Sequence, residues 1–126
     1  MTSRLAIVIG ALLMAAAVGC GAFGAHALKP RLPPEQLAVW QTAVNYHAWH
    51  ALGLLAAGLL MLQAPDATTL RYAAALFVAG IVLFSGSLYG LALGAPSLLG
   101  FVTPFGGAAF IAGWVTLAVG VLRQPG

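Results

Sequence analysis

The chain has 126 residues, of which 62% are hydrophobic and only 6% are charged. Because soluble domains carry about 25% charged residues, this composition excludes an ordinary soluble fold and predicts an integral membrane protein. The net charge of +3 comes without a basic cluster, so we expect contacts with membrane lipids and no nucleic-acid partner.

Four apolar segments are each long enough to cross a bilayer as a helix, which takes about 20 residues. They cover residues 5–28, 42–63, 70–94 and 101–122. Polar stretches that contain proline separate them, and none of these has room for a soluble domain. The sequence therefore predicts an all-α fold, in which residues 1–126 form a single transmembrane domain built as a four-helix bundle.

Small residues recur at four-residue spacing in the first and third segments. Such stripes allow helices to approach closely in a membrane, where packing replaces the hydrophobic effect as the driving force. The predicted helix-packing residues are Ala17, Gly21 and Ala25 in the first segment and Gly86, Gly90 and Gly94 in the third. We interpret both stripes as contacts within one chain, with a dimer surface as the alternative.

Cys20 gives the first segment an alternative interpretation. Together with Arg4 and the apolar run between them, it loosely resembles a lipoprotein signal peptide in which the cysteine is acylated. The sequence stays apolar through Leu28, whereas a mature lipoprotein turns polar after its cysteine. We therefore expect the first segment to be retained as a span, and the intact mass distinguishes the two interpretations.

The second segment is expected to begin as a helix before it enters the membrane. Pro34 suits a first helical position, and the acidic Glu35 follows it in the first turn. A helix from there to Gln63 would be about 45 Å long, which exceeds the thickness of the hydrocarbon. We expect a tilt, a bend or an interfacial first section, with Trp40 and Trp49 as headgroup anchors.

Polar residues gather where the first and third segments end and where the second and fourth begin, which a four-span topology brings to one membrane face. Intramembrane polar residues usually face a bundle interior or a wet cavity, and they mark function when several converge. Their donors, acceptors and amphipathic rings suit the headgroup of a lipid, a quinone or another amphiphile. The candidate ligand-binding residues are His26, Asn45, Tyr46, His47, His50, Ser85, Ser87, Tyr89 and Thr103.

The histidines also admit a metal site. His47 and His50 are three residues apart on one helix face, and His26 lies at a similar depth at the end of the first segment. Glu35 is the only carboxylate nearby, and histidines commonly form hydrogen bonds between membrane helices. We predict no metal and no other cofactor, and we keep a metal or haem redox site at these histidines as an alternative.

The sequence contains no arrangement typical of an enzyme. It has no Ser-His-acid set, no paired carboxylates and no phosphate-binding loop. We therefore expect a non-enzymatic protein that binds an amphiphilic ligand or a partner protein through the polar pocket, as a homo-oligomer or within a larger membrane complex. A small oligomeric transporter or channel is the alternative, although the two halves show no inverted repeat.

Basic residues at the ends of the segments indicate the orientation. Arg4, Arg71 and Arg123 fall on one side of the predicted bundle, whereas Lys29 and Arg31 fall on the other. Since cytoplasmic loops carry an excess of basic residues, this distribution predicts that both termini are cytoplasmic.

Several motifs in these polar regions resemble a known family. They are residues 21–29 (GAFGAHALK), 40–43 (WQTA), 84–89 (FSGSLY) and 103–107 (TPFGG). Together they resemble a family of small bacterial inner-membrane proteins typified by YgdD and YwdK, and the resemblance includes His26 and His50. It implies a multi-pass four-helix protein of the bacterial inner membrane, in a family of unknown biochemical function, and it identifies no catalytic residues.

Overall fold

A computed structural model describes all residues from 1 to 126, and it contains only helices and the turns that connect them. The elements are α1 (Ser3–Phe23), η1 (Gly24–Leu28), α2 (Pro34–Gln63), α3 (Thr68–Gly80), η2 (Ile81–Ser85), α4 (Gly86–Ala92), η3 (Ser97–Phe101) and α5 (Thr103–Leu122). The segments η1 and η2 are single π-helical turns, so that α1 with η1, and α3 with η2 and α4, form continuous rods. The all-α prediction is confirmed.

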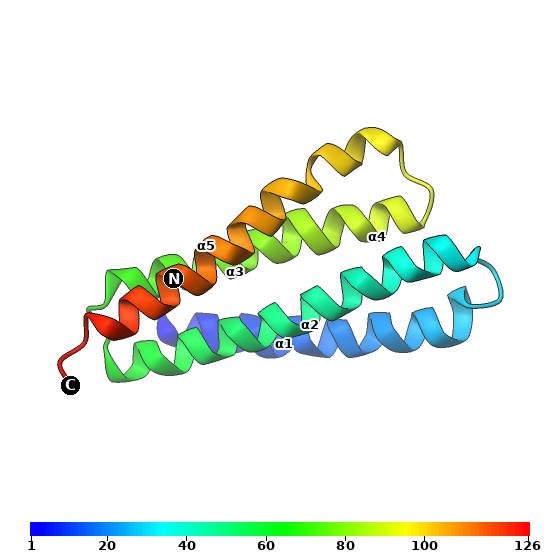
Figure 1. The fold of residues 1–126 in the computed structure, drawn as a ribbon. Coiled ribbons are helices and arrows are strands. Elements are labelled where there is room, and N and C mark those ends of the chain that lie inside the picture. Colours follow the sequence, from blue (N-terminus) through cyan, green and yellow to red (C-terminus); the bar gives the residue numbers. More distant parts are fainter.

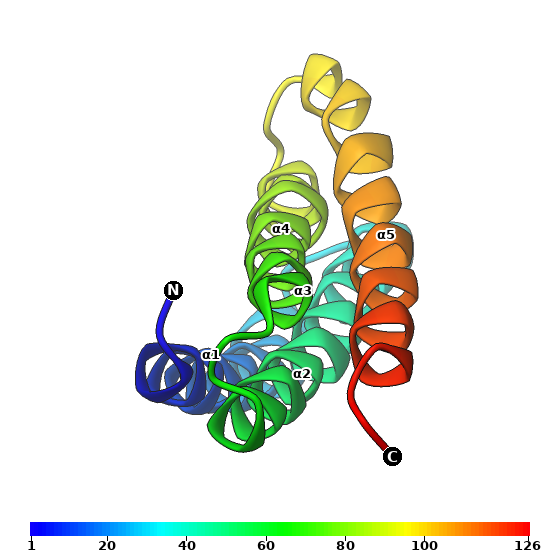
Figure 2. The same ribbon diagram turned by 90° about the vertical axis from the view of Figure 1, so that its left-hand side faces the viewer.

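The four rods form two antiparallel pairs that lie against each other (Figures 1 and 2). The first rod packs mainly on α2, α2 packs on the third rod, and the third rod packs on α5. Both chain termini lie at the same end of the molecule (Figure 1). The two central rods, α2 and α3–η2–α4, therefore contribute most of the interior.

Three helical stretches are long and apolar enough to cross a membrane: Ser3–Leu28, Thr68–Ala92 and Ser97–Leu122. The predicted second span is not among them, so the four-span bundle is supported for three of its four helices. The helix α2 is left out because its amide and histidine side chains lower its mean hydropathy.

Glycines set the distance between α1 and α2. A Cβ on Gly58 of α2 would come within 2.8 Å of the Ile7 side chain, and a Cβ on Gly10 of α1 would come within 3.0 Å of Leu55. Close approach of this kind increases the van der Waals contact that holds membrane helices together. In the predicted first stripe, Ala17 is buried and Gly21 faces Val44, whereas Ala25 is exposed.

The predicted stripe in the third rod is corrected. Gly86 is exposed, and a Cβ there would approach only the carbonyl of Ile81 in its own helix. Gly94 ends α4 with a φ of 95°, and the amides of Gly94 and Ala95 donate to the carbonyls of Leu91 and Gly90. This is a Schellman motif, in which glycine avoids the steric cost of a positive φ. Gly90 approaches Leu99 in the following turn.

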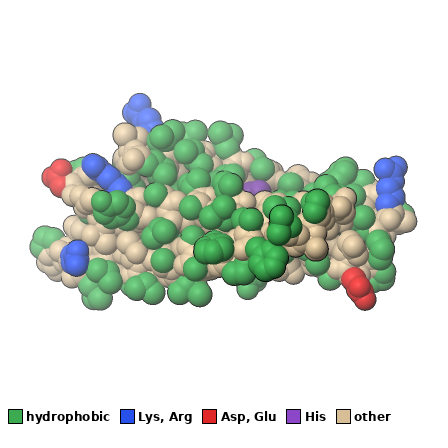
Figure 3. Space-filling view, turned by 90° about the horizontal axis from the view of Figure 1, so that it is seen from above, with side chains coloured by type: hydrophobic (Ala, Val, Ile, Leu, Met, Phe, Trp, Pro, Cys, Tyr) green, Lys and Arg blue, Asp and Glu red, His purple; other side chains and the backbone are tan.

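Charged side chains lie at the two ends of the molecule, and apolar side chains cover the length between them (Figure 3). Many large apolar side chains are exposed, including Leu12 of α1 at 65%, Val82 of η2 at 63% and Ile111 of α5 at 69%. Exposed apolar surface of this extent is expected of a protein surrounded by lipid.

Candidate functional site

The third rod hydrogen-bonds to α2 where the π-helical turn η2 meets it. The hydroxyl of Ser85 is fully buried and donates to the carbonyl oxygen of Ala43 at 2.8 Å. Backbone that departs from α-helical bonding in a membrane requires compensating partners. Ser85 therefore joins the two central rods at a point where the backbone is irregular.

Ser87 and Thr103 compensate for the same irregular turn. The Ser87 hydroxyl donates to the carbonyl oxygen of Phe84 at 2.9 Å and lies 2.6 Å from the Thr103 hydroxyl. Since a serine hydroxyl has one hydrogen, Thr103 must donate the second bond. The chain from Thr103 through Ser87 to Phe84 thus connects the start of α5 to the π-helical turn.

His47 and Tyr89 join α2 to α4 in the interior. The Nδ1 atom of His47 lies 2.8 Å from the hydroxyl oxygen of Tyr89, and His47 is only 5% exposed. Its Nε2 atom is buried without a hydrogen-bond partner, although the backbone of Leu13 on α1 is a neighbour. Trp40 also contacts Tyr89, with ring centroids 4.6 Å apart and ring planes tilted at 58°.

His50 lies in an aromatic cluster rather than in an open pocket. Its Nδ1 is 2.6 Å from the carbonyl oxygen of Tyr46, which can only accept, so Nδ1 carries the proton. The ring stacks on Phe110 of α5 with centroids 3.5 Å apart and planes at 12°. Tyr46, Phe77 and Trp114 surround the same histidine, with centroids within 6 Å.

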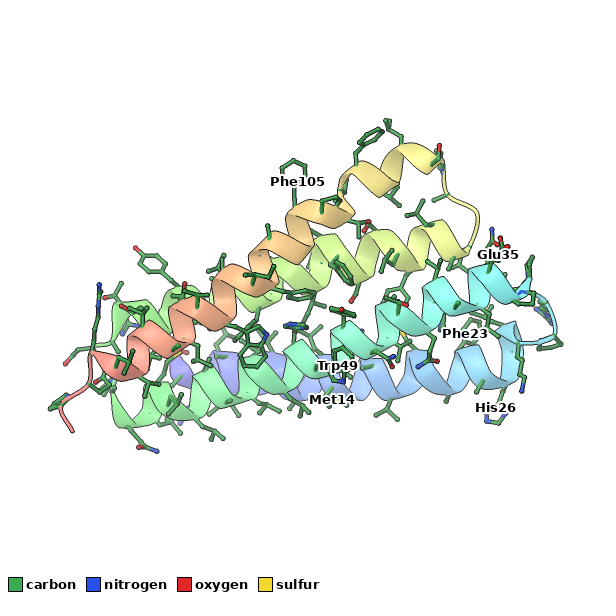
Figure 4. All side chains as sticks on the ribbon, viewed as in Figure 1. Met14, Phe23, His26, Glu35, Trp49 and Phe105 are labelled. Carbon is green, nitrogen blue, oxygen red and sulfur yellow. The ribbon has the colours of Figure 1, made fainter.

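His26 does not join the other two histidines. It is exposed near the end of the first rod and points away from α2 (Figure 4). No group of three histidine, cysteine, aspartate or glutamate side chains lies close enough to hold a metal ion. The alternative site formed by His26, His47 and His50 is therefore not assembled in this structure.

Gln41 is exposed on α2, and the half-buried Asn45 follows it one helical turn later. The amide nitrogen of Gln41 donates to Oδ1 of Asn45 at 2.9 Å, and this pair is exposed. Thr42 is also exposed, but its hydroxyl donates to the carbonyl of Ala38 one turn earlier. The amide nitrogen of Asn45 and the amide oxygen of Gln41 have no partner within the chain.

We name the stripe that continues from this pair the α2 outer face. Its residues follow each other at intervals of three or four, so they lie on one side of the helix. They are the exposed Gln41, Trp49, Leu52, Ala56 and Leu59, together with the half-buried Asn45. Trp49, Leu52 and Leu59 are each more than half exposed.

Comparison with known proteins places this architecture in a family. Residues 20–107 match the family described as protein of unknown function, DUF423. The chain belongs to the DUF423 family. The matched region runs from the last α-helical turn of α1 to the first turn of α5, so it contains every polar contact described above.

Relatives in this family are named membrane proteins. The chain is 45% identical to the membrane protein YwdK of Bacillus subtilis, an alignment that covers 93% of this chain and 95% of YwdK. It is 42% identical to the membrane protein SH2409 of Staphylococcus haemolyticus, with 98% and 99% covered. It is 41% identical to the inner membrane protein YgdD of Escherichia coli K12, with 98% and 93% covered. No solved structure matches the chain.

The comparisons confirm the resemblance to the YgdD and YwdK family and identify an integral membrane protein. The names of these relatives describe no activity, ligand or partner. Ligand binding by the nine candidate residues thus stays a prediction.

The predicted polar pocket is not hollow in this DUF423 structure. None of the nine candidate residues lines any of the three cavities. The largest cavity, about 350 Å³, lies at the opposite end, between the ends of α2 and α5 and the start of α3. Its lining residues are Leu60, Gln63, Ala64, Leu70, Val121, Gln124 and Pro125.

Two contacts in the site were not expected from the sequence. The indole nitrogen of Trp40 donates to the backbone carbonyl of Cys20 at 2.9 Å, and Trp40 is only 6% exposed, so it is not a headgroup anchor. A Cβ on Gly106 of α5 would overlap the backbone nitrogen of Phe84. The Gly106-Gly107 pair in the sequence indicates that another helix packs closely against α5. The sequence does not identify that helix as the one that contains Phe84.

Proposed function

We propose that this protein has four spans and binds a partner protein within the membrane through the α2 outer face, without catalysis. The observation that carries the proposal is the Gln41–Asn45 amide pair, which is exposed on a helix inside an otherwise apolar surface. Amide side chains of membrane helices form hydrogen bonds between helices, because hydrocarbon offers them no other partner.

The position of α2 supports a fourth span. It begins at the end of the molecule where the first rod finishes, and it finishes at the end where α3 begins (Figure 1). If the first and third rods cross the membrane, α2 must cross it too. The histidines that lower its hydropathy are each only 5% exposed, so they lie inside the bundle and away from lipid.

The charged ends support cytoplasmic termini. Arg4, Arg71 and Arg123 lie at the start of α1, the start of α3 and the end of α5, which is the end of the molecule that contains both termini (Figure 1). Lys29 and Arg31 lie in the turn between η1 and α2 at the other end. This arrangement follows the positive-inside rule, with three basic residues on the cytoplasmic side against two.

The amide pair lies deeper in the membrane than polar residues of the headgroup region. Asn45 follows Pro34 by eleven positions, which is about 17 Å along a helix. The headgroup region on each side is only about 6 Å thick. Since α2 starts at the end of the bundle, the amide of Asn45 lies at hydrocarbon depth, where its unpaired donors carry a cost that a partner removes.

The other polar candidates support binding at this face rather than in an internal pocket. His47, His50, Ser85, Ser87 and Thr103 form hydrogen bonds within the chain. Their contacts hold the helices together, whereas Gln41 and Asn45 keep amide groups that have no partner within the chain.

The proposal is tested by native mass spectrometry of protein extracted gently from its own membrane. The unchanged chain is expected to retain a protein partner. The double variant Gln41→Leu with Asn45→Leu is expected to lose that partner while it still inserts and keeps its helical content. The matched control is Gln36→Leu, which removes a half-buried amide from the first turn of α2.

Two outcomes overturn the proposal. A retained lipid that is lost in the double variant would identify the face as an amphiphile site instead of a protein interface. An assembly that is unchanged in the double variant would show that the amide pair binds nothing.

A further inference from the structure

We infer that the partner bound by the α2 outer face is a second copy of this chain. The inference rests on the proposed function and names the partner of the same face. It predicts a parallel dimer in which the two α2 helices meet around Asn45, with the pair related by a two-fold axis along the membrane normal.

Membrane insertion supplies the first argument. All copies of a membrane protein insert with the same orientation, so a two-fold axis along the normal places each residue opposite its own copy at the same depth. Asn45 is the only asparagine in the chain, and in such a dimer it would face Asn45 of the second copy. A different partner would need a polar side chain of its own at this depth.

The chemistry of the amide supplies the second argument. An amide side chain contains two N–H donors and a carbonyl acceptor, so it is complementary to an identical group. Within the chain, the bond from Gln41 occupies Oδ1 of Asn45 and leaves its amide nitrogen unpaired, while the Gln41 amide oxygen accepts no bond. Across the axis, the nitrogen of each Asn45 can donate to an amide oxygen of the other copy.

The rest of the α2 outer face can close around this polar pair. Ala56 is a small exposed residue three turns beyond Asn45, which permits the helices to stay close. Leu52 and Leu59 lie on either side of Ala56, at 53% and 52% exposure. The face therefore combines a polar contact near one membrane surface with an apolar seam that continues toward the other.

The exposed faces of the outer helices lack this combination. Leu12 and Val18 on α1 are 65% and 64% exposed, and Phe105 and Ile111 on α5 are 71% and 69% exposed. No asparagine or glutamine occurs in α1 or α5. Lipid satisfies such apolar faces, so these helices give no comparable reason to bind a second copy.

The test is photo-crosslinking in intact membranes of cells that express two differently tagged copies. The photoreactive residue p-benzoylphenylalanine replaces Leu52 on α2, or Leu12 on α1 and Ile111 on α5 as matched controls. At position 52 we expect a product of twice the monomer mass that contains both tags, and we expect none at positions 12 and 111. Adding Asn45→Leu and Gln41→Leu should lower its yield about tenfold, the loss expected from about 1–2 kcal/mol of interhelical hydrogen bonding.

The remaining outcomes overturn the inference in distinguishable ways. A crosslink from position 52 to a different protein would refute the second copy and leave the proposed function intact. A two-tag product formed equally from position 12 or 111 would show association without a specific α2 face. If position 52 gave no protein product at all, both the inference and the proposed function would be wrong.

Discussion

The Nδ1 atom of His47 lies 2.8 Å from the hydroxyl oxygen of Tyr89, and this bond joins the two central rods of the bundle. The other ring nitrogen of His47 is buried and unpaired, so Tyr89 is the only hydrogen-bonding side chain that the imidazole contacts. The pair is therefore a sensitive point for the stability of this interface.

A double-mutant cycle should measure that coupling. Tyr89→Phe removes the hydroxyl and leaves His47 with both nitrogens buried and unpaired, which should lower the free energy of unfolding by about 1–3 kcal/mol. His47→Phe and the double variant complete the cycle, and we expect a coupling of about 0.6–1.7 kcal/mol. The measurement is detergent-induced unfolding followed by circular dichroism. Strictly additive effects would show that the contact contributes nothing.

The glycines at the start of α5 provide a matched comparison. A Cβ on Gly106 would overlap the backbone of Phe84, whereas a Cβ on Gly107 would lie 3.7 Å from the Phe84 ring, an ordinary contact. Gly106→Ala should therefore cost about 1–3 kcal/mol as α5 moves away from η2, and Gly107→Ala should cost much less. The same unfolding assay tests this, and equal effects at both positions would contradict the packing of α5 on η2.

The histidines should separate into structural and exposed groups. His50→Ala removes a ring that is stacked on Phe110, and it should lower the free energy of unfolding by at least about 2 kcal/mol. His26→Ala changes an exposed side chain and should stay within about 0.5 kcal/mol. Elemental analysis of both variants provides a second readout. A stoichiometric metal that disappears in both would restore the histidine metal site as an explanation.

The orientation is open to a direct experiment. A reporter that fluoresces only in the cytoplasm, fused after Gly126, should be active if both termini are cytoplasmic, as the basic residues predict. A paired reporter that is active only outside the membrane should remain inactive at the same site. A reporter inserted after Arg31 should give the opposite pattern, because the turn between η1 and α2 lies at the other end of the bundle. Identical patterns at both sites would refute the odd number of spans, three, that the proposal places between Arg31 and the C-terminus.

Much of the fold follows from local signals in the sequence. Proline at its first position and an acidic residue in its first turn correctly predicted that α2 begins at Pro34, and the helix continues unbroken for 30 residues. The apolar lengths also predicted the other three rods within a few residues of their ends. These signals are local because they depend on backbone propensity and on the thickness of a bilayer.

The interior of the third rod could not be predicted, because its helical period changes. Phe77 is fully buried, and an α-helix would bury residues 84 and 91 on the same face. Buried Ser85 and Ala92 stand there instead, each one position later. The π-helical turn η2 contains the additional residue and shifts every later position. A stripe read with α-helical spacing consequently selected Gly86, Gly90 and Gly94 as an interhelical groove.

The candidate site was predicted as a set of residues but not as a set of contacts. Seven of the nine candidates lie inside or between the helices and make contacts with one another or with the backbone. His26 is exposed instead, and the half-buried Asn45 bonds only to the exposed Gln41. Helix rotation decides this difference. It depends on close contacts such as that between Gly106 and Phe84, which side-chain type and spacing do not specify.

The order in which the rods pack matches the order in which a ribosome produces them. The first rod packs on α2, α2 on the third rod, and the third rod on α5, so each helix binds the one that preceded it. A helix that enters the membrane during synthesis therefore finds its main neighbour already inserted. No helix must wait for a distant part of the chain, and its unpaired polar groups are exposed to lipid only until the next helix arrives.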